Sequence, residues 1–292
     1  MIDFQRKILG DGIRNAALHE ALKKAIVPGK TTVADIGAGT GYLSLVALKL
    51  GAAQCFLYDH PEALALARKI ARENGLEKKC RFIPFHSSEI KQPVKVDLVI
   101  SETLGNFATE EHIIENMEDA KRFLKPGGTL IPQTLKQFVV PVISERLMRD
   151  IDVWNDILGG INFRPARELA LRNLYVEKVL KADLLSGKDA QKEWDRIDFR
   201  KRTASIRRGE VSWKFSRNTT IYGFACFWEC ELVPGVRLST SPFSKSTHWD
   251  QIFVPLLEPM VHRAGDRLTL RMTSDSRLDI GLRVRWETRQ TP

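Results

Sequence analysis

The stretch TVADI GAGTG YLSLVALKL, residues 32–50, decides the fold of this chain. Its first five residues are short, apolar and partly β-branched, as in a buried strand, and a turn with Gly37, Gly39 and Gly41 follows directly. After the turn, apolar residues recur at helical spacing until Gly51. A strand, a glycine turn and a helix in this order predict the first half of a βαβ unit.

The same alternation continues on both sides of this stretch. Upstream, residues 4–26 carry apolar side chains three and four positions apart, which predicts one or two amphipathic helices. Downstream, strand-like and helix-like segments alternate: strands are predicted at residues 54–58, 80–85, 96–100 and 129–131, and helices at residues 61–74 and 110–124. This alternation predicts an α/β fold with a doubly wound, Rossmann-like parallel sheet over residues 1–132.

The pattern changes after Pro132. Residues 144–158 and 164–171 are helical and irregular, and the remaining apolar runs are short and separated by turn residues. These runs lie at residues 138–143, 211–215, 220–230, 251–254, 267–272 and 282–286. Their spacing is typical of an antiparallel β sandwich or barrel, so we place a domain boundary near residue 133 and predict a second domain over residues 133–292.

Length and composition set further bounds. With 292 residues, 43% hydrophobic and 28% charged, the chain can form one large or two medium folded units. The sequence has neither a run of eighteen apolar residues nor a signal peptide, so we predict a soluble, cytoplasmic protein with no membrane partner. Its four cysteines form no C-x-x-C pair and have no histidines at zinc-ligand spacing, so no metal site is predicted.

The net charge is +9, and a basic stretch covers residues 196–214. A basic face of this kind is able to hold the phosphate backbone of a nucleic acid. However, the same residues alternate with apolar ones, as on a solvated edge strand, where charges discourage aggregation. We favour the strand-edge interpretation and keep nucleic acid as a less favoured partner.

The glycine turn also indicates a cofactor. A dinucleotide fingerprint would have a third glycine where this chain has Tyr42, so a bound pyrophosphate is disfavoured. Asp59 ends the second predicted strand, where it is placed to accept hydrogen bonds from both hydroxyls of a ribose. A nucleoside without a diphosphate predicts S-adenosyl-L-methionine as the cofactor. The alternative is that the glycines serve tight packing and that Asp59 caps a helix.

Two glutamates, Glu102 and Glu111, follow the fourth predicted strand. A pair of carboxylates beside a cofactor predicts a clamp for a cation, and guanidinium matches carboxylates two at a time through its planar donors. The alternative is that Glu102 caps a strand end while Glu110 and Glu111 open the next helix, where the macrodipole favours acids.

Taken together, the glycine turn, the two-glutamate loop at residues 101–111, the run at residues 239–242 and Thr247-His248-Trp249 resemble the protein arginine methyltransferases. The likeness spans nearly the whole chain. It implies a Rossmann-like cofactor domain, a β barrel, and a helical arm, here residues 144–174, that pairs two subunits into a homodimer.

The resemblance also implies site residues. It assigns catalysis to Glu102, Glu111 and His248, and substrate binding to Trp249 and Thr247. The cofactor residues it implies are Arg14, on the methionyl carboxylate, and Asp35, Gly37, Gly39, Gly41, Asp59, Ser88 and Glu102. No metal is implied.

The chain also departs from this family's pattern. Seven residues precede the first matching helix, where the family has an aromatic cover helix, so we expect an N-terminally short member. In the two-glutamate loop, Thr103, Leu104 and Asn106 replace the usual tryptophan, methionine and tyrosine.

The predicted reaction is methyl transfer from S-adenosylmethionine to a guanidino nitrogen of arginine in a protein or peptide. The two carboxylates would orient the guanidinium, and the proton would leave through Glu111 or His248. Two alternatives stay open: a methyltransferase for another substrate, such as a ribosomal protein, RNA or a small amine, and a catalytically weak dimer that binds an adenosyl ligand.

Overall fold

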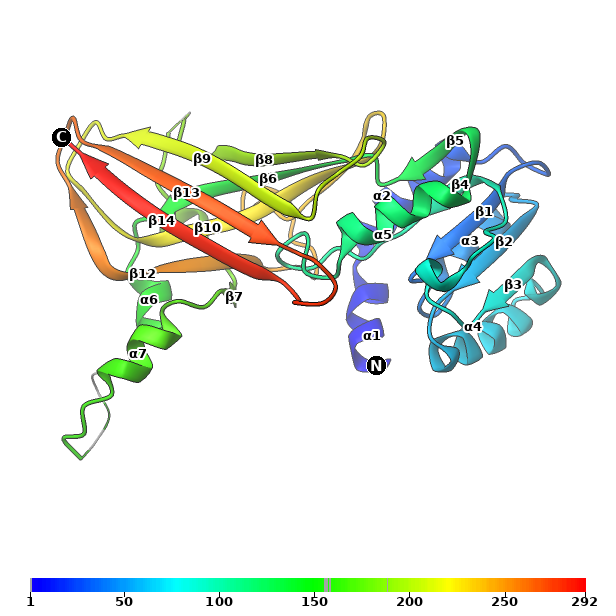
Figure 1. Ribbon diagram of the computed structural model, residues 1–292, viewed down its shortest axis with the longest axis horizontal. Coiled ribbons are helices and arrows are strands. Elements are labelled where there is room, and N and C mark those ends of the chain that lie inside the picture. Colours follow the sequence, from blue (N-terminus) through cyan, green and yellow to red (C-terminus); the bar gives the residue numbers. More distant parts are fainter. Residues whose placement is uncertain (1, 155–156, 158, 188) are drawn as a thin grey trace.

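The computed structural model describes residues 2–154, 157, 159–187 and 189–292. It is elongated, with an α/β part at one end and an antiparallel β part at the other (Figure 1). The N-terminal helix α1 (Ile2–Gly10) lies at the junction of the two parts, and a helical arm projects from the β part.

The α/β part contains a five-stranded parallel sheet in the order β3-β2-β1-β4-β5. Its strands are β1 (Thr32–Ile36), β2 (Gln54–Tyr58), β3 (Cys80–Ile83), β4 (Val96–Ile100) and β5 (Leu124–Ile131). The helices are α2 (Gly12–Ala25), α3 (Tyr42–Lys49), α4 (Pro61–Glu73) and α5 (Ile113–Ala120), with short 3₁₀ turns η1 (Glu77–Lys79), η2 (Ser87–Glu89) and η3 (Lys121–Phe123). The strand order reverses between β1 and β4, and ligands of open α/β sheets bind beyond the carboxyl ends of the strands at such a point.

The predicted helix at residues 110–124 is shorter than expected. Helix α5 begins at Ile113, and His112 precedes it in a left-handed conformation with φ 59°. Glu110 and Glu111 therefore stand before the helix and do not form its first turn. Strand β5 begins at Leu124, five residues earlier than predicted.

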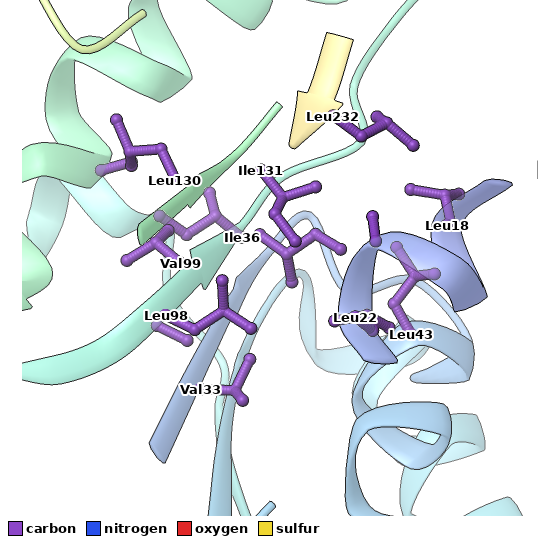
Figure 2. Close-up of a cluster of buried hydrophobic side chains, with 14 of the residues drawn as sticks. Leu18, Leu22, Val33, Ile36, Leu43, Leu98, Val99, Leu130, Ile131 and Leu232 are labelled. Carbon is purple, nitrogen blue, oxygen red and sulfur yellow. The ribbon is translucent and has the colours of Figure 1, made fainter. Parts of the chain in front are cut away.

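One apolar core joins the two parts of the molecule. Val33 and Leu98 of the parallel sheet are fully buried against Leu18 and Leu22 of α2. Figure 2 shows that Leu232, from an antiparallel strand, meets the same cluster. Burial of this apolar area fixes α2 between the two parts, and α2 carries the residues at its N-terminal end into the junction.

The antiparallel part contains two sheets. The first has the order β7-β12-β10-β6-β8, with β11 paired to β10, and the second has the order β14-β13-β9. The bounds are β6 (Thr134–Val142), β7 (Tyr175–Glu177), β8 (Lys192–Asp198), β9 (Ile206–Lys214), β10 (Thr219–Val233), β11 (Val236–Ser239), β12 (Gln251–His262), β13 (Arg267–Asp275) and β14 (Arg283–Thr291). A further 3₁₀ turn, η4, spans Lys181–Asp183. The inner faces of the two sheets enclose a second apolar core that includes Phe224, Val254, Trp213 and Leu268.

The arm consists of α6 (Arg146–Ile151) and α7 (Arg164–Ala170). Arg167 of α7 pairs with Asp152 at 2.8 Å and with Glu258 of β12 at 2.9 Å, which ties the arm to the β part. Part of the predicted arm, residues 155, 156 and 158, lies outside the described residues.

The basic stretch lies on β8, β9 and their connection. Arg196 pairs with Glu193 at 2.7 Å, and Arg207 of β9 pairs with the buried Asp195 of β8. Acids of the same strand or its neighbour thus offset these two charges. Within the described residues, no helix is long and apolar enough to cross a membrane.

Candidate active site

The glycine turn between β1 and α3 has the backbone that its sequence requires. Gly37, Gly39 and Gly41 have φ angles of 75°, 54° and 77°, which side chains rarely tolerate. A Cβ on Gly37 would lie 2.9 Å from the side chain of Thr103, next to Glu102. Asp59, just past β2, accepts a hydrogen bond of 2.7 Å from the Gly39 N–H through Oδ2. The turn and Asp59 are therefore locked together beside the two-glutamate loop.

Asp35, at the end of β1, is engaged within the protein. Its carboxylate is buried and accepts hydrogen bonds from the Ser44 N–H at 3.1 Å and the Ser44 hydroxyl at 2.7 Å. Burial raises the pKa of Asp35 to about 6. The side chain thus ties the end of β1 to the first turn of α3 and positions the glycine turn between them, and its role toward the cofactor stays a prediction.

A pocket of about 210 Å³ opens beyond the carboxyl ends of the strands. Its walls include Gly37, Asp59, Thr103 and Glu111. The structure thus brings the glycine turn, Asp59 and one of the two glutamates together around one space.

Ser87, and not Ser88, faces this pocket. The His86 ring caps the η2 turn and lies 2.7 Å from the Ser88 hydroxyl, which holds Ser88 on the exposed side. Ser87 is buried in the pocket wall, and among the described residues its hydroxyl has no hydrogen-bond partner. The predicted position, Ser88, is thus outside the pocket, and the neighbouring Ser87 lines it.

Glu102 meets Arg14 at the junction. Arg14, in the first turn of α2, donates from Nε to Glu102 Oε2 at 2.6 Å and from Nη2 to the same oxygen. Both side chains are buried at this contact, each only 6% exposed. The resemblance assigns Arg14 to the cofactor and Glu102 to the substrate, and this ion pair joins the two residues in one charged cluster.

Glu111 shares this electrostatic environment. Part of the residue is open to solvent, but desolvation of its carboxylate and the negative charges of Glu102 and Glu110 raise its pKa to about 7. A carboxylate that lies near two other negative charges forms a site that a cation would stabilise.

Asn116 braces the two-glutamate loop. From the first turn of α5, its amide donates to the Thr103 hydroxyl at 2.9 Å and to the Glu111 carbonyl at 3.3 Å. It therefore fixes the loop just after Glu102 and again at Glu111. Sequence reasoning did not identify Asn116, because an asparagine in a helix carries no signal of a distant loop.

Two tryptophans hold the middle of the same loop. Trp249 Nε1 donates to the Leu104 carbonyl at 2.7 Å, and Trp228 Nε1 donates to the Gly105 carbonyl at 3.0 Å. The two rings meet edge to face, with centroids 5.0 Å apart. Trp249 thus positions the glutamate loop, and its role as a wall for the substrate stays a prediction.

His248 pairs with Asp11, the N-cap of α2. Asp11 Oδ2 lies 2.8 Å from His248 Nδ1 and accepts from the His248 N–H at 2.8 Å. Burial alone would raise the pKa of Asp11, but hydrogen bonds from the Arg14 N–H and His248 outweigh it, so the pKa is lowered. The carboxylate stays ionised and orients the imidazole next to Trp249.

Thr247 lies on a different side of its loop. Its hydroxyl donates to the Trp249 carbonyl at 3.3 Å, and its outer face lines a second pocket of about 360 Å³ with Lys7 and Asp11. The structure places Thr247 beside the Asp11–His248 pair and outside the pocket that contains Glu111.

With this geometry established, we compared the chain with known proteins. Residues 135–289 match the family model of the arginine methyltransferase oligomerization subdomain, which is more than half of the chain. The chain belongs to the arginine methyltransferase family. Residues 17–136 also match the model of ribosomal protein L11 methyltransferase, which fits a methyltransferase domain ahead of the family-specific part.

Curated proteins that resemble this family member are themselves named as arginine methyltransferases. Protein arginine N-methyltransferase 6 of Xenopus laevis is 28% identical over 279 residues, covering 88% of this chain and 79% of the relative. Protein arginine N-methyltransferase 1 of Dictyostelium discoideum is 27% identical over 271 residues, covering 90% and 79%.

Solved structures share the fold. The Trypanosoma brucei PRMT1 enzyme–prozyme heterotetrameric complex with AdoHcy gives a TM-score of 0.86 at 24% identity, covering 98% of this chain and 92% of that one. A PRMT6–SAH structure gives 0.79 at 20% identity, covering 99% and 100%. The predicted family, its methyltransferase enzyme class, and the α/β plus antiparallel fold are thereby confirmed.

Proposed function

We propose that the protein transfers a methyl group from S-adenosylmethionine to a guanidino nitrogen of arginine in a protein or peptide. The observation that carries this proposal is that Glu111 lines one pocket with Gly37 and Asp59, where desolvation and then the negative charges of Glu102 and Glu110 raise its pKa to about 7. A guanidinium would relieve the repulsion between the two carboxylates, because its planar donors match two acceptors at once.

The residues of the pocket fit the cofactor. Gly37 presents bare backbone to the pocket, and Asp59 lines the same pocket just past β2. Ser87 contributes a buried hydroxyl that, among the described residues, lacks a protein partner. The guanidinium of Arg14 pairs with Glu102 through Nε and Nη2, and we assign the same guanidinium to the methionyl carboxylate when the cofactor is bound. When bound, the cofactor supplies an electrophilic methyl group on a sulfonium.

The protein's part in the reaction is to orient the substrate and to take its proton. Guanidinium is a poor nucleophile because its nitrogen lone pairs are delocalised. In the proposed site, Glu102 and Glu111 hold the planar group and draw positive charge toward themselves, so that the remaining nitrogen is more nucleophilic. Glu111 is the favoured proton acceptor because its pKa of about 7 matches that task, while Asp11 holds His248 beside Trp249.

This assignment predicts a pH dependence. The carboxyl of Glu111 must be ionised to pair with a guanidinium, and its pKa is raised to about 7. The kcat/KM for methyl transfer should therefore rise about tenfold per pH unit below neutrality and level off above it. In Glu111→Gln this ionisation is gone, so the remaining slow transfer should be flat between pH 6 and 8. A wild-type profile with no inflection in this range would contradict the role of Glu111.

We expect the target arginine to lie in a sequence that is less basic than a typical arginine-rich tail. The protein carries a net charge of +9. Of the nearby acids, Glu115 accepts from Ser276 and Glu118 pairs with Lys121, so both are used internally. Attraction of a strongly basic tail would rest on Glu110 and Glu111.

The direct test is to incubate the protein with methyl-labelled S-adenosylmethionine and separate substrate pools. These are arginine peptides with basic or acidic flanks, matched peptides with lysine in place of arginine, free arginine, a small amine and RNA. Label on the arginine peptides and not on the lysine peptides is expected. Label on RNA or on the amine would support another substrate. Binding of S-adenosylhomocysteine without transfer to any pool would support the catalytically weak adenosyl-binding dimer.

We also propose that the arm pairs two copies of the chain and that residue 133 begins the β domain. Val153, Ile161 and Leu169 of the arm expose large apolar side chains, and Leu169 is 71% exposed. Apolar residues gathered on a projecting arm are typical of a surface that another chain covers.

We also propose a cytoplasmic location. The free thiols of Cys55, Cys80, Cys226 and Cys230 fit a reducing compartment of this kind.

Leu169→Glu tests the pairing. A charge buried against an apolar partner surface should weaken dimerisation at least tenfold, as seen by sedimentation over a range of concentrations. Val94→Glu is the matched control, because Val94 is also exposed but lies just before β4, in the α/β part and not in the β part that carries the arm. A wild-type protein that sediments as a monomer throughout, or a Leu169→Glu variant that dimerises like the control, would rule out this arm as the interface.

A further inference from the structure

The connection between β13 and β14, residues 276–282, returns from the β part to the cofactor pocket. Ser276 anchors it and is fully buried. Its carbonyl lies 2.8 Å from His112 Nδ1, and its hydroxyl donates to Glu115 Oε1 at 2.9 Å. The Ser276 N–H donates to the Ser205 carbonyl at 3.3 Å. These contacts hold the connection against the start of α5, directly after Glu111.

Two residues beyond this anchor, Leu278 lines the same pocket as Asp59, Ser87 and Glu111. Its side chain is 55% exposed. Phe85, from the loop after β3, lines the pocket as well and is 53% exposed. Two large apolar side chains from distant parts of the chain thus border one small pocket while remaining open to solvent. A flat apolar ligand between them would remove that area from water, worth roughly 25 cal/mol per Å².

The strand order indicates which end of a bound adenosyl cofactor Leu278 and Phe85 would face. The pocket runs from Gly37 after β1, past Asp59 after β2, to Phe85 and Ser87 after β3. If Asp59 binds the ribose, the base lies outward, beside Phe85. Helix α5 packs against the η2 turn that contains Ser87, so the connection anchored on α5 by Ser276 also lies at this outer end.

We propose that Leu278 is a cofactor-binding residue of the β domain, which forms an apolar wall against the adenine opposite Phe85. The inference rests on the proposed cofactor site. In this proposal, residues of both domains line the adenine pocket. The cofactor would then lie next to the segment that anchors His112, the residue that follows Glu111.

The test is calorimetric binding of S-adenosylhomocysteine, adenosine and methionine to the full chain. Leu278→Ala should weaken binding of S-adenosylhomocysteine and of adenosine by the same factor, about tenfold, and leave methionine unchanged. Phe85→Ala should behave alike. Leu257→Ala is the control, since Leu257 is a partly exposed leucine that lines a different groove on β12. Because Leu278 is half exposed, its loss should leave the melting temperature unchanged.

The outcomes distinguish a failure of the Leu278 assignment from a failure of the proposed function. If wild type binds S-adenosylhomocysteine and Leu278→Ala binds it equally well, Leu278 is not part of the adenine site while the proposed function stands. A loss that appears with methionine but not with adenosine would likewise overturn the placement. If wild type binds none of the adenosyl ligands, the proposed function falls, and this inference falls with it.

Discussion

Glu102→Gln is expected to lower kcat for arginine methylation by about 10³-fold, while the Kd for S-adenosylhomocysteine changes only a few-fold. The substitution keeps the size of the side chain and an oxygen for Arg14, but it removes the charge that would stabilise the guanidinium as it reacts. A group that acts mainly in the transition state affects kcat more than ligand affinity. Single-turnover transfer of a labelled methyl group, alongside calorimetry, measures both quantities.

Glu110→Gln is the matched control for this experiment. Glu110 lies in the same loop, is exposed, and contributes to the raised pKa of Glu111 without being buried against Arg14. We expect it to retain transfer within a few-fold and to shift the pH profile slightly toward lower pH. Turnover of Glu102→Gln within tenfold of wild type would remove Glu102 from the proposed catalytic pair.

Trp228→Ala is expected to destabilise the protein by about 3–5 kcal/mol, the usual cost of deleting a buried aromatic side chain. Trp228 is 1% exposed, packs edge to face on Trp249, and donates to the Gly105 carbonyl. It lies in the core that joins the two domains, so its loss leaves a cavity and releases the glutamate loop together. Urea unfolding followed by circular dichroism measures the stability change.

Two further variants separate packing from loop positioning. Trp228→Phe keeps most of the ring volume and loses the indole N–H, so we expect a stability loss of about 1 kcal/mol and a clear fall in kcat. Trp286→Ala, in a partly exposed tryptophan of β14, should be milder than Trp228→Ala. If it proved equally costly, Trp228 would not hold the special place that we give it.

Local patterns predicted most of the α/β domain. The glycine turn, Asp59 and the alternation of strands and helices depend on neighbours within a few residues, and each lies where it was expected. The errors arose where distant contacts override local preference. The acids at residues 110–111 favour a helix start by themselves, but Asn116 and the two tryptophans hold this loop, which runs through turns, out of a helix until Ile113.

Site residues divide in the same way. Ser88 and Asp35 were assigned by their place in a motif, whereas a ring hydrogen bond from His86 turns Ser88 outward and Ser44 engages Asp35. Asp11, Asn116 and Ser276 lack any motif of their own. Their importance for the site comes from their partners, which are His248 for Asp11, Glu111 for Asn116 and His112 for Ser276. These partners lie 237, 5 and 164 positions away in sequence.

By itself, the sequence determined which elements form and which residues are chemically able to clamp a cation, because periodicity, glycine conformation and carboxylate chemistry are local properties. The tertiary structure alone decided that Arg14, Glu102 and Glu111 share one electrostatic site and that indole N–H groups from the β domain set the loop between the glutamates. It also decided that Leu278 reaches the pocket that contains Asp59 and Glu111. The physical reason is that charge coupling and burial depend on distance in space, which is fixed only when the two domains pack around a common core.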